Sequence, residues 1–597
     1  MERLPNWQIA IKRLEMPVER FLFIYVGSSF LMGLFTALAI VFLIPGLFVG
    51  FSAILIILSL PFISGGAAAM FPLLELQRCA VRIEKEMHMF IPRMGILSLG
   101  EAGANSMFDI LRQMGDYGEL AQEVKRINTL VDKWHTSLPE AARIVAQQSA
   151  SPLWADFLDR MSFSIEAGQP IDGFMRAEQE TIAEQYETLY DTRLEAVDNL
   201  KEIYISLVSA SLFGLVIAGI HLVLFQTGRV DDLTIDILAR MRWLLLAGFF
   251  FAIIQIGSLF AFRSTIPDDP IFARDEMDTP HRLLFSQALV FSILITAFMI
   301  VFTSIATWMY WDGIIAEWDR YGLILIAAPF TPLLIPAWIE KREETQIHRR
   351  DESYPGFIRA LGGTAQARAA EPSATIRALR GIDFGLLDHA IDRLENRLSM
   401  RIDSERAWDY FSAETNSALI SRFNRIYIEG SQSSGEPAAT AEMVSKSTSG
   451  LLSLRHRRSL SAKTMWGTAI GLMIAAIASL NVTNTIIVQL GESIGGMAAG
   501  MVDVDLASVT ETGTGGFGLP ALDDNTVVEQ NIFLFKFTIS VLIIIKIIVL
   551  SGITTRLRGG GWSSAVGMMV QMTWIAGLVS LLTTTALESS LSMFTVD

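Results

Sequence analysis

Cysteine, histidine and charge are scarce in this chain of 597 residues. The single cysteine, Cys79, excludes an intramolecular disulfide framework, and seven scattered histidines without ligand spacing give no metal site. Charged residues make up 18% of the sequence, below the quarter that is typical of soluble proteins, while apolar residues make up 51%. These averages exclude a soluble enzyme, a fibrous protein and a disordered tail. Because long uncharged runs alternate with charge-dense blocks, the sequence predicts an all-α polytopic membrane protein.

The uncharged runs predict about nine transmembrane helices. A span needs about 20 apolar residues, so the 54 uncharged residues from Phe21 to Leu74 provide two, with a turn at Pro45-Gly46. The seven other predicted spans are 203–228, 243–262, 283–311, 321–339, 464–490, 532–555 and 559–587. Prolines at three positions interrupt the span 321–339, so we expect that helix to be kinked.

Two charged blocks between the spans are too long to be loops. The predicted order is a cytoplasmic N-terminus (1–20), a transmembrane hairpin (21–74), a cytoplasmic helical domain (75–202), helices three and four (203–263), helices five and six (283–339), a second cytoplasmic helical domain (340–463), helix seven (464–490), an acidic extracytoplasmic loop (491–531), and helices eight and nine with an outside C-terminus (532–597).

The charge distribution predicts the orientation. With the N-terminus inside, the segments left outside carry 15 acidic and four basic residues. Cytoplasmic segments retain Lys and Arg, so the reverse orientation is rejected. We therefore expect a multi-pass cell-membrane protein with a cytoplasmic N-terminus and an extracytoplasmic C-terminus. The net charge of −15 also gives no nucleic-acid footprint.

Local signals mark helices in the first cytoplasmic block. Ser151-Pro152 predicts a helix N-cap followed by proline at the first helical position, and Gly168 predicts the C-terminal end of that helix. From about Ile171 the helical pattern continues into the third span.

The two blocks read as a repeat. Hairpin, domain and following span recur at an offset near 263 residues, so a unit of hairpin, helical bundle and helix occurs twice. The fourth span restarts the second copy. The matching residues are Phe157, Arg160, Ile165, Glu166 and Gly168 in the first copy, and Phe423, Arg425, Ile428, Glu429 and Gly430 in the second.

The sequence contains no phosphate-binding G-x-x-x-x-G-K-[ST] and no H-E-x-x-H, so we expect no enzyme activity and no cofactor. Lys546 lies near the middle of the span 532–555, where a charge is costly. It either packs against backbone carbonyls or contacts a moving subunit or ion. The basic cluster Arg455, Arg457, Arg458 and Lys463 precedes the span 464–490. It either anchors the membrane edge or docks an acidic partner or anionic lipid.

The stretches 115–175 and 418–431, together with the topology, resemble the platform proteins of type IV pilus-like machines, the type II secretion F-domain superfamily. Nine spans and this length are most similar to the archaeal branch, in particular the J-type platform proteins of the archaellum, the archaeal flagellum. One departure is that the second domain lacks a clear counterpart of the SLPEAARIVA helix.

The resemblance implies that this chain binds partner proteins and does not itself catalyse a reaction. A hexameric secretion-type ATPase would dock on the cytoplasmic side, and archaellin or pilin subunits would be inserted from the membrane into the filament, with rotation in the archaellum. The platform is either a monomer or a homodimer. Candidate docking residues are Arg160, Glu166, Gly168, Arg425, Glu429 and Gly430. The alternative for Arg160 and Glu166 is that they pair within their own bundle.

Two other functions stay open. The first is the platform of an archaeal adhesive pilus or related secretion system. The second is a secondary transporter, which internal repeats and proline-broken spans favour and for which Lys546 would be the coupling charge. Two helical cytoplasmic domains count against the transporter.

Overall fold

The computed structural model describes the chain except at residues 1–4, 14–16, 44–50, 99–106, 109–110, 112–116, 225–232, 268, 274–278, 369–371, 435, 503–524 and 595–597. Within the described ranges every regular element is a helix, and one isolated antiparallel bridge joins Phe272 to Ser417. Eight helices there are long and apolar enough to cross a membrane. The predicted all-α polytopic fold is therefore confirmed. The predicted turn at Pro45-Gly46 lies outside the described residues.

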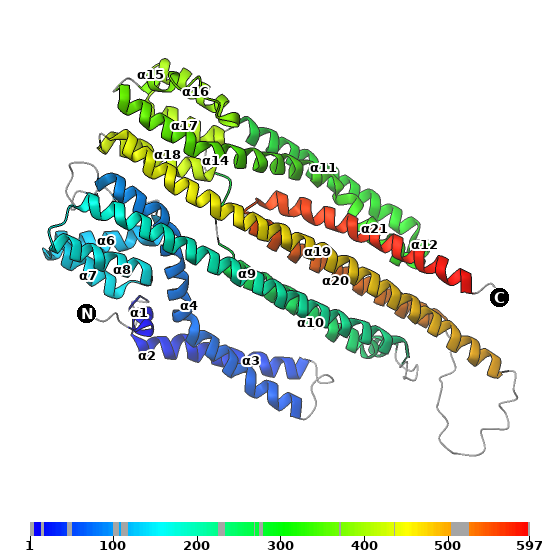
Figure 1. The fold of residues 1–597 in the computed structure, drawn as a ribbon. Helices are drawn as coiled ribbons and strands as arrows, with labels where there is room; N and C mark the ends of the chain where they lie inside the picture. Colours follow the sequence, from blue (N-terminus) through cyan, green and yellow to red (C-terminus); the bar gives the residue numbers. More distant parts are fainter. Residues whose placement is uncertain are drawn as a thin grey trace. The chain divides into compact units, whose positions relative to one another are not determined.

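Figure 1 labels the helices along the chain. The chain divides into two compact units. Unit 1 contains residues 1–188, 355–382 and 422–450. Its helices are α1 (Asn6–Arg13), α2 (Val18–Phe21), a π-helix (Leu22–Val26), α3 (Gly27–Leu43), α4 (Phe51–Ser98), α6 (Gly118–Trp134), α7 (Leu138–Gln148), α8 (Pro152–Glu166), α15 (Pro372–Arg377), and parts of α9 (Ile171–Leu224), α14 (Leu334–Arg368), α18 (Ala418–Ser434) and α19 (Pro437–Val502). Residues of both predicted helical blocks thus belong to unit 1.

Unit 2 contains residues 189–354, 383–421 and 451–597. Its helices are α10 (Leu233–Thr265), α11 (Pro280–Met309), α12 (Trp311–Ala316), α13 (Trp318–Ala327), a 3₁₀ helix (Ala328–Leu333), a second 3₁₀ helix (Gly385–Leu387), α16 (Asp388–Ser399), α17 (Ser404–Thr415), α20 (Asn525–Arg558), α21 (Trp562–Phe594), and the remaining parts of α9, α14, α18 and α19. α19 continues to Val502 and α20 begins at Asn525, so helix enters both ends of the predicted loop 491–531, whose residues 503–524 lie outside the described part.

Local sequence explains where the helices begin and break. Ser151 accepts a hydrogen bond from the N–H of Trp154 at 3.3 Å, and Gly168 takes φ +71° after α8, as the sequence predicted. The predicted kink is a 3₁₀ segment containing Pro329 and Pro332, which separates α13 from α14. α9 runs unbroken through 54 residues, as expected from the pattern that begins near Ile171.

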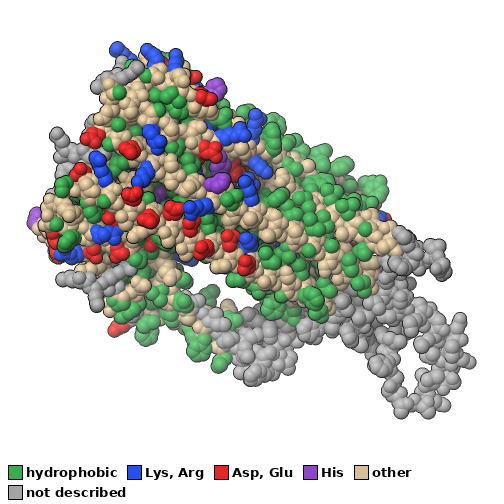
Figure 2. Space-filling model, viewed as in Figure 1, with side chains coloured by type: hydrophobic (Ala, Val, Ile, Leu, Met, Phe, Trp, Pro, Cys, Tyr) green, Lys and Arg blue, Asp and Glu red, His purple; other side chains and the backbone are tan. Residues whose placement is uncertain are grey.

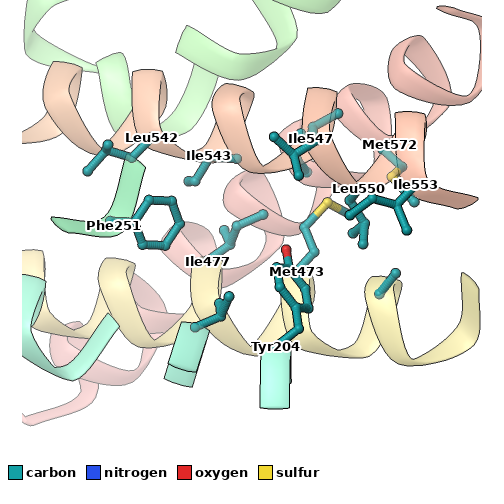
Figure 3. Close-up of a cluster of buried hydrophobic side chains, with 14 of the residues drawn as sticks. Tyr204, Phe251, Met473, Ile477, Leu542, Ile543, Ile547, Leu550, Ile553 and Met572 are labelled. Atoms are coloured by element: carbon teal, nitrogen blue, oxygen red, sulfur yellow. The ribbon is translucent and has the colours of Figure 1, made fainter. Parts of the chain in front are cut away.

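The core of unit 2 is apolar and centred on α20. Of the candidate spans, α20 is the most enclosed, with 61% of its apolar window buried, whereas the window in α11 is 11% buried. Figure 3 shows side chains of α9, α10, α19 and α21 meeting those of α20. Polar groups in this core are hydrogen-bonded: the Tyr204 hydroxyl, for example, donates to Gln255 at 2.9 Å. On the face in Figure 2, hydrophobic side chains cover the part away from the charged ones.

The two predicted blocks share part of their helix order. α6, α7, α8 and the long α9 of the first block are matched by α16, α17, α18 and the long α19 of the second, where α15 and a 3₁₀ helix also precede α16. The sequence interpretation found no clear counterpart of the SLPEAARIVA helix, and by this order α17 takes its place. Asp403 caps α17 by accepting from the N–H of Arg406 at 3.3 Å. The counterpart was hidden because α17 begins with a different cap and lacks the proline.

Candidate functional site

A buried ion-pair cluster joins three distant parts of unit 2. Arg455, on α19, donates to Asp269 through Nε at 2.7 Å and Nη2 at 2.9 Å. Its Nη1 donates to Asp351, on α14, at 2.8 Å. Asp351 has no exposed surface, and the Arg455 side chain is 7% exposed. One guanidinium thus satisfies two carboxylates, which makes each member costly to remove. We call Asp269, Asp351, Arg455 and Ser417 the junction cluster.

Ser417 connects this cluster to the start of α18. Its hydroxyl donates to Asp351 and accepts from the N–H of Ile420 at 3.2 Å, so it is the N-cap of α18. The segment after α10 lies against the same turn, where the N–H of Ala418 donates to Ile271 O at 2.9 Å. The N–H of Ala273 donates to Asn416 O at 3.1 Å. These two backbone hydrogen bonds hold the segment around Ile271–Ala273, which follows α10, against the turn between α17 and α18.

Arg458 joins the same region to the end of α20. Its Nε donates to the carbonyl of Leu557 at 2.7 Å and its Nη2 to that of Arg556 at 2.7 Å. Its Nη1 donates to Asp269 O at 3.1 Å. A cation on the last carbonyls of a helix completes hydrogen bonds that the helix itself cannot make. The chain then reverses through Gly559, at φ +79°, into α21.

The structure corrects the docking interpretation of the basic cluster. Arg455 and Arg458 are buried and bonded inside unit 2, so they do not form an exposed docking patch. Arg457 is ion-paired with Asp191. Lys463 alone of the four is exposed without a hydrogen bond or ion pair to another described residue. In the sequence, a basic run before a span resembles a membrane anchor. The acidic partners that bury it lie up to 186 residues away, so they cannot be recognised from the run itself.

The predicted residues at the end of α8 pair within unit 1. Arg160 forms an ion pair with Glu178, which is buried, and keeps 39% of its side chain exposed. Glu166 pairs with Arg143 at 2.9 Å, and half of its side chain is open to water. Arg160 and Glu166 therefore do not pair with each other. This helix end still presents polar groups at its surface.

The matching residues on α18 are less accessible. Arg93, on α4, is buried and pairs with Glu429, and it donates to the Tyr117 hydroxyl at 3.0 Å. Burial lowers the pKa of Arg93, but Tyr117 and Glu429 outweigh it, so the pKa is raised; burial raises the pKa of Tyr117. Gly430 does not end its helix as Gly168 does. It lies inside α18, and a Cβ there would overlap with Ile96 and lie 2.8 Å from Thr440 Cγ2.

Arg425 is exposed on α18 and takes part in contacts of its own. Glu429 is partly exposed and paired with the buried Arg93, and Gly430 packs inside unit 1. The α8 end with Arg160, Glu166 and Gly168 remains a candidate docking surface.

Lys546 is buried in the core of unit 2. Its side chain is 2% exposed, and Nζ donates to the carbonyl of Leu472, on α19, at 3.1 Å. Within the described part of the chain this is its one polar partner. A second lysine of the same span, Lys536, pairs with Asp319 at 3.0 Å. The geometry agrees with the packing interpretation of Lys546.

Comparisons with known proteins agree with the resemblance seen in the sequence. The family model of type II secretion system (T2SS), protein F, matches residues 90–219. Residues 90–219 are a T2SS protein F domain. In this domain lie the α8 end, the capped start of α8 and the first part of α9.

The chain is also similar to flagella accessory proteins J of two archaea. The protein of Methanococcus voltae is 28% identical over 461 residues, which are 75% of this chain and 79% of that protein. The protein of Methanocaldococcus jannaschii is 29% identical over 450 residues, 74% of this chain and 77% of that one. No solved structure matches the chain. The predicted resemblance to the archaellum platform is confirmed, and the chain is a multi-pass membrane protein that is similar to these proteins.

Proposed function

We propose that this protein is the platform of an archaellum machine, which holds a hexameric secretion-type ATPase at its cytoplasmic helices and couples ATP hydrolysis to insertion of filament subunits. The naming of both relatives as flagella accessory proteins favours the archaellum over the adhesive pilus. In this proposal the cytoplasmic side carries the N-terminus and both helical blocks, and the filament subunits enter from the membrane. The platform itself performs no catalysis.

The observation that carries the proposal is the continuity of helix between water-facing and apolar segments. α9 spans 54 residues and α19 spans 66, and each changes along its length from charged to apolar. A helix transmits displacement along its axis because every backbone bond is internal. The junction cluster lies where α14 and α19 approach the predicted membrane edge. A force on the cytoplasmic helices would therefore reach α10 and α20 through Arg455 and Arg458.

The end of α8 supports docking of the ATPase. Besides Arg160 and Glu166 it carries Phe163, an aromatic side chain that is 70% exposed on a water-facing helix. Buried aromatic anchors with polar neighbours carry most of the binding energy at protein interfaces. We therefore assign docking to the surface of Arg160, Phe163 and Glu166.

Pull-down with the hexameric secretion-type ATPase tests this assignment. Phe163→Ser combined with Arg160→Glu should leave membrane insertion near normal and weaken ATPase binding about tenfold or more. Trp134→Ser is the matched control, because Trp134 is 73% exposed at the end of a different helix. Wild-type binding by the double variant would place docking elsewhere. Loss of the protein from the membrane would make these residues structural.

ATP hydrolysis tests the coupling. The purified platform should hydrolyse no ATP alone, since the sequence has no phosphate-binding loop. Added to the ATPase, it should change the rate of hydrolysis. Hydrolysis at an enzymatic rate by the platform alone would overturn the non-catalytic role. A deletion strain that swims normally but no longer adheres would favour the adhesive-pilus alternative.

A further inference from the structure

A cavity of about 320 Å³ opens in unit 2 between the ends of α10 and α20 and the start of α21. Three arginines line it: Arg263 in the last turn of α10, Arg556 in the last turn of α20, and Arg458. The one acidic lining residue is Asp269. Because Asp269 already receives two hydrogen bonds from Arg455, the lining has a net positive charge.

Two of these arginines are available to a ligand. Arg458 uses three N–H groups on backbone carbonyls. Arg263 and Arg556 have no ion pair with another described residue, and the Nε of Arg556 is buried without a hydrogen-bond partner in the described part. A buried donor without a partner costs free energy. An anionic group in the cavity would supply the missing acceptor.

The apolar part of the lining lies on one side of the arginines. α10 and α20 are parallel, because Gly248 lies next to Leu542 and Gly552 lies next to Leu259. Leu259 and Gly552 each precede the cavity arginine of their helix by four residues, which is about 6 Å along the axis. Both lie toward the apolar interior of their spans. The cavity is therefore amphiphilic, polar at the helix ends and apolar one turn deeper.

The rim has the composition of a membrane interface. Trp562, which is 62% exposed, lines the opening at the start of α21. Tryptophan and arginine gather at the level of lipid headgroups. The N-terminus of α21 is not part of the ligand site, since the Glu340 carboxylate already accepts hydrogen bonds there from Gly561 and Ser564.

We propose that this cavity binds the phosphate group of an anionic phospholipid, with Arg263 and Arg556 on the phosphate and one acyl chain along Leu259 and Gly552. Bound there, the lipid bridges α10, α20 and α21 beside the junction cluster. The inference does not depend on the platform function. A free phosphate would satisfy the arginines equally, but would leave the apolar wall uncovered.

Lipid binding to the full-length protein tests the site. The protein in nonionic detergent is titrated with dioleoyl phosphatidylglycerol, dioleoyl phosphatidylcholine or inorganic phosphate, and followed by native mass spectrometry and melting temperature. Phosphatidylglycerol should bind and raise the melting temperature. Arg263→Gln with Arg556→Gln should weaken that binding about tenfold. Arg342→Gln, which removes an exposed arginine that does not line the cavity, should not.

Each other result overturns part of the assignment. Equal phosphatidylglycerol binding by the wild type and the double variant would show that Arg263 and Arg556 do not form the binding site. Equal binding of phosphatidylcholine removes the role of charge, and equal protection by inorganic phosphate replaces the lipid with a soluble anion. Should the double variant fail to fold, Gly552→Phe fills the apolar end and leaves both arginines in place. It should weaken phosphatidylglycerol binding about tenfold, and unchanged binding would exclude the acyl-chain contact.

Discussion

The hydroxyl of Ser417 donates to the carboxylate of Asp351 while its oxygen caps α18. One repeat earlier, Ser151 donates to Glu84 at 3.1 Å and caps α8 in the same way. In each case the N-cap serine donates a hydrogen bond to a carboxylate on the long helix that precedes the bundle. The repeat therefore extends to a hydrogen-bonded pair that no residue match in the sequence had revealed.

Removing the two caps should have unequal effects. Ser151→Ala should lower the free energy of unfolding by about 1 kcal/mol, the usual effect of losing a cap. Ser417→Ala should lower it by about 1–3 kcal/mol, because the buried Asp351 also loses a donor. Thermal unfolding in detergent measures both. Ser431→Ala is the control, since Ser431 donates only to Ile428 within its own helix. Equal effects of Ser417→Ala and Ser431→Ala would contradict the cap.

Arg455 is expected to be the most sensitive charged residue of unit 2. Arg455→Gln leaves Asp269 and Asp351 without their cation, and breaking a buried pair in this way costs about 3–5 kcal/mol. Arg457→Gln, on the neighbouring exposed position, should cost about 0–1 kcal/mol. Melting temperature and yield in the membrane fraction distinguish them. A partial recovery with Asp351→Asn in the same chain would show that the two residues are coupled, and its absence would argue against the pair.

Sequence reasoning succeeded where the signal is local. The cap at Ser151, the stop at Gly168, the proline-broken span and the unbroken α9 each depend on residues within a few turns. The uncharged runs likewise predicted an all-α polytopic chain, because a membrane-spanning helix satisfies its own backbone hydrogen bonds.

Sequence reasoning failed where distant segments meet. Arg455 lies 104 residues from Asp351 and 186 from Asp269, so the sequence near the arginine does not indicate which carboxylates it binds. Gly430 resembled Gly168 in its neighbours, yet only the packing of α4 on α18 shows that it is a contact glycine. Asp351 lies 12 residues beyond the predicted span 321–339, among other charged residues, so no local signal marked it.

Gly430 should tolerate no side chain. Gly430→Ala places a Cβ against Ile96 and Thr440 in the contact between α4 and α18, which should cost about 1–3 kcal/mol through overpacking. Gly363→Ala is the matched control, because nothing lies within 4 Å of its added Cβ and alanine favours helix. It should be neutral or stabilising by thermal unfolding. If Gly430→Ala behaves in the same way, α4 and α18 are not in close contact.

Lys546 should be replaceable by an apolar side chain. Lys546→Met keeps the length of the chain and removes a buried charge whose described partner is the Leu472 carbonyl. Replacing a buried charge by a packed apolar group is often neutral or stabilising. The variant should therefore melt at the same or a higher temperature and support filament assembly. Normal melting with lost assembly would instead assign Lys546 a role in the moving part of the machine.

Orientation in the membrane should follow the charge count. The segments expected outside hold 15 acidic and four basic residues, so positions in the 491–531 region should be reached from outside and those in the F domain should not. In a Cys79→Ser background, Gly515→Cys and Trp134→Cys provide one site of each kind, and Trp134 is exposed in the F domain. A membrane-impermeant maleimide applied to intact cells should label only the first. Both should react after lysis, which controls for access. Labelling of Trp134→Cys in intact cells would show that the orientation is the reverse of the predicted one. It would also contradict docking of a cytoplasmic ATPase on the F domain.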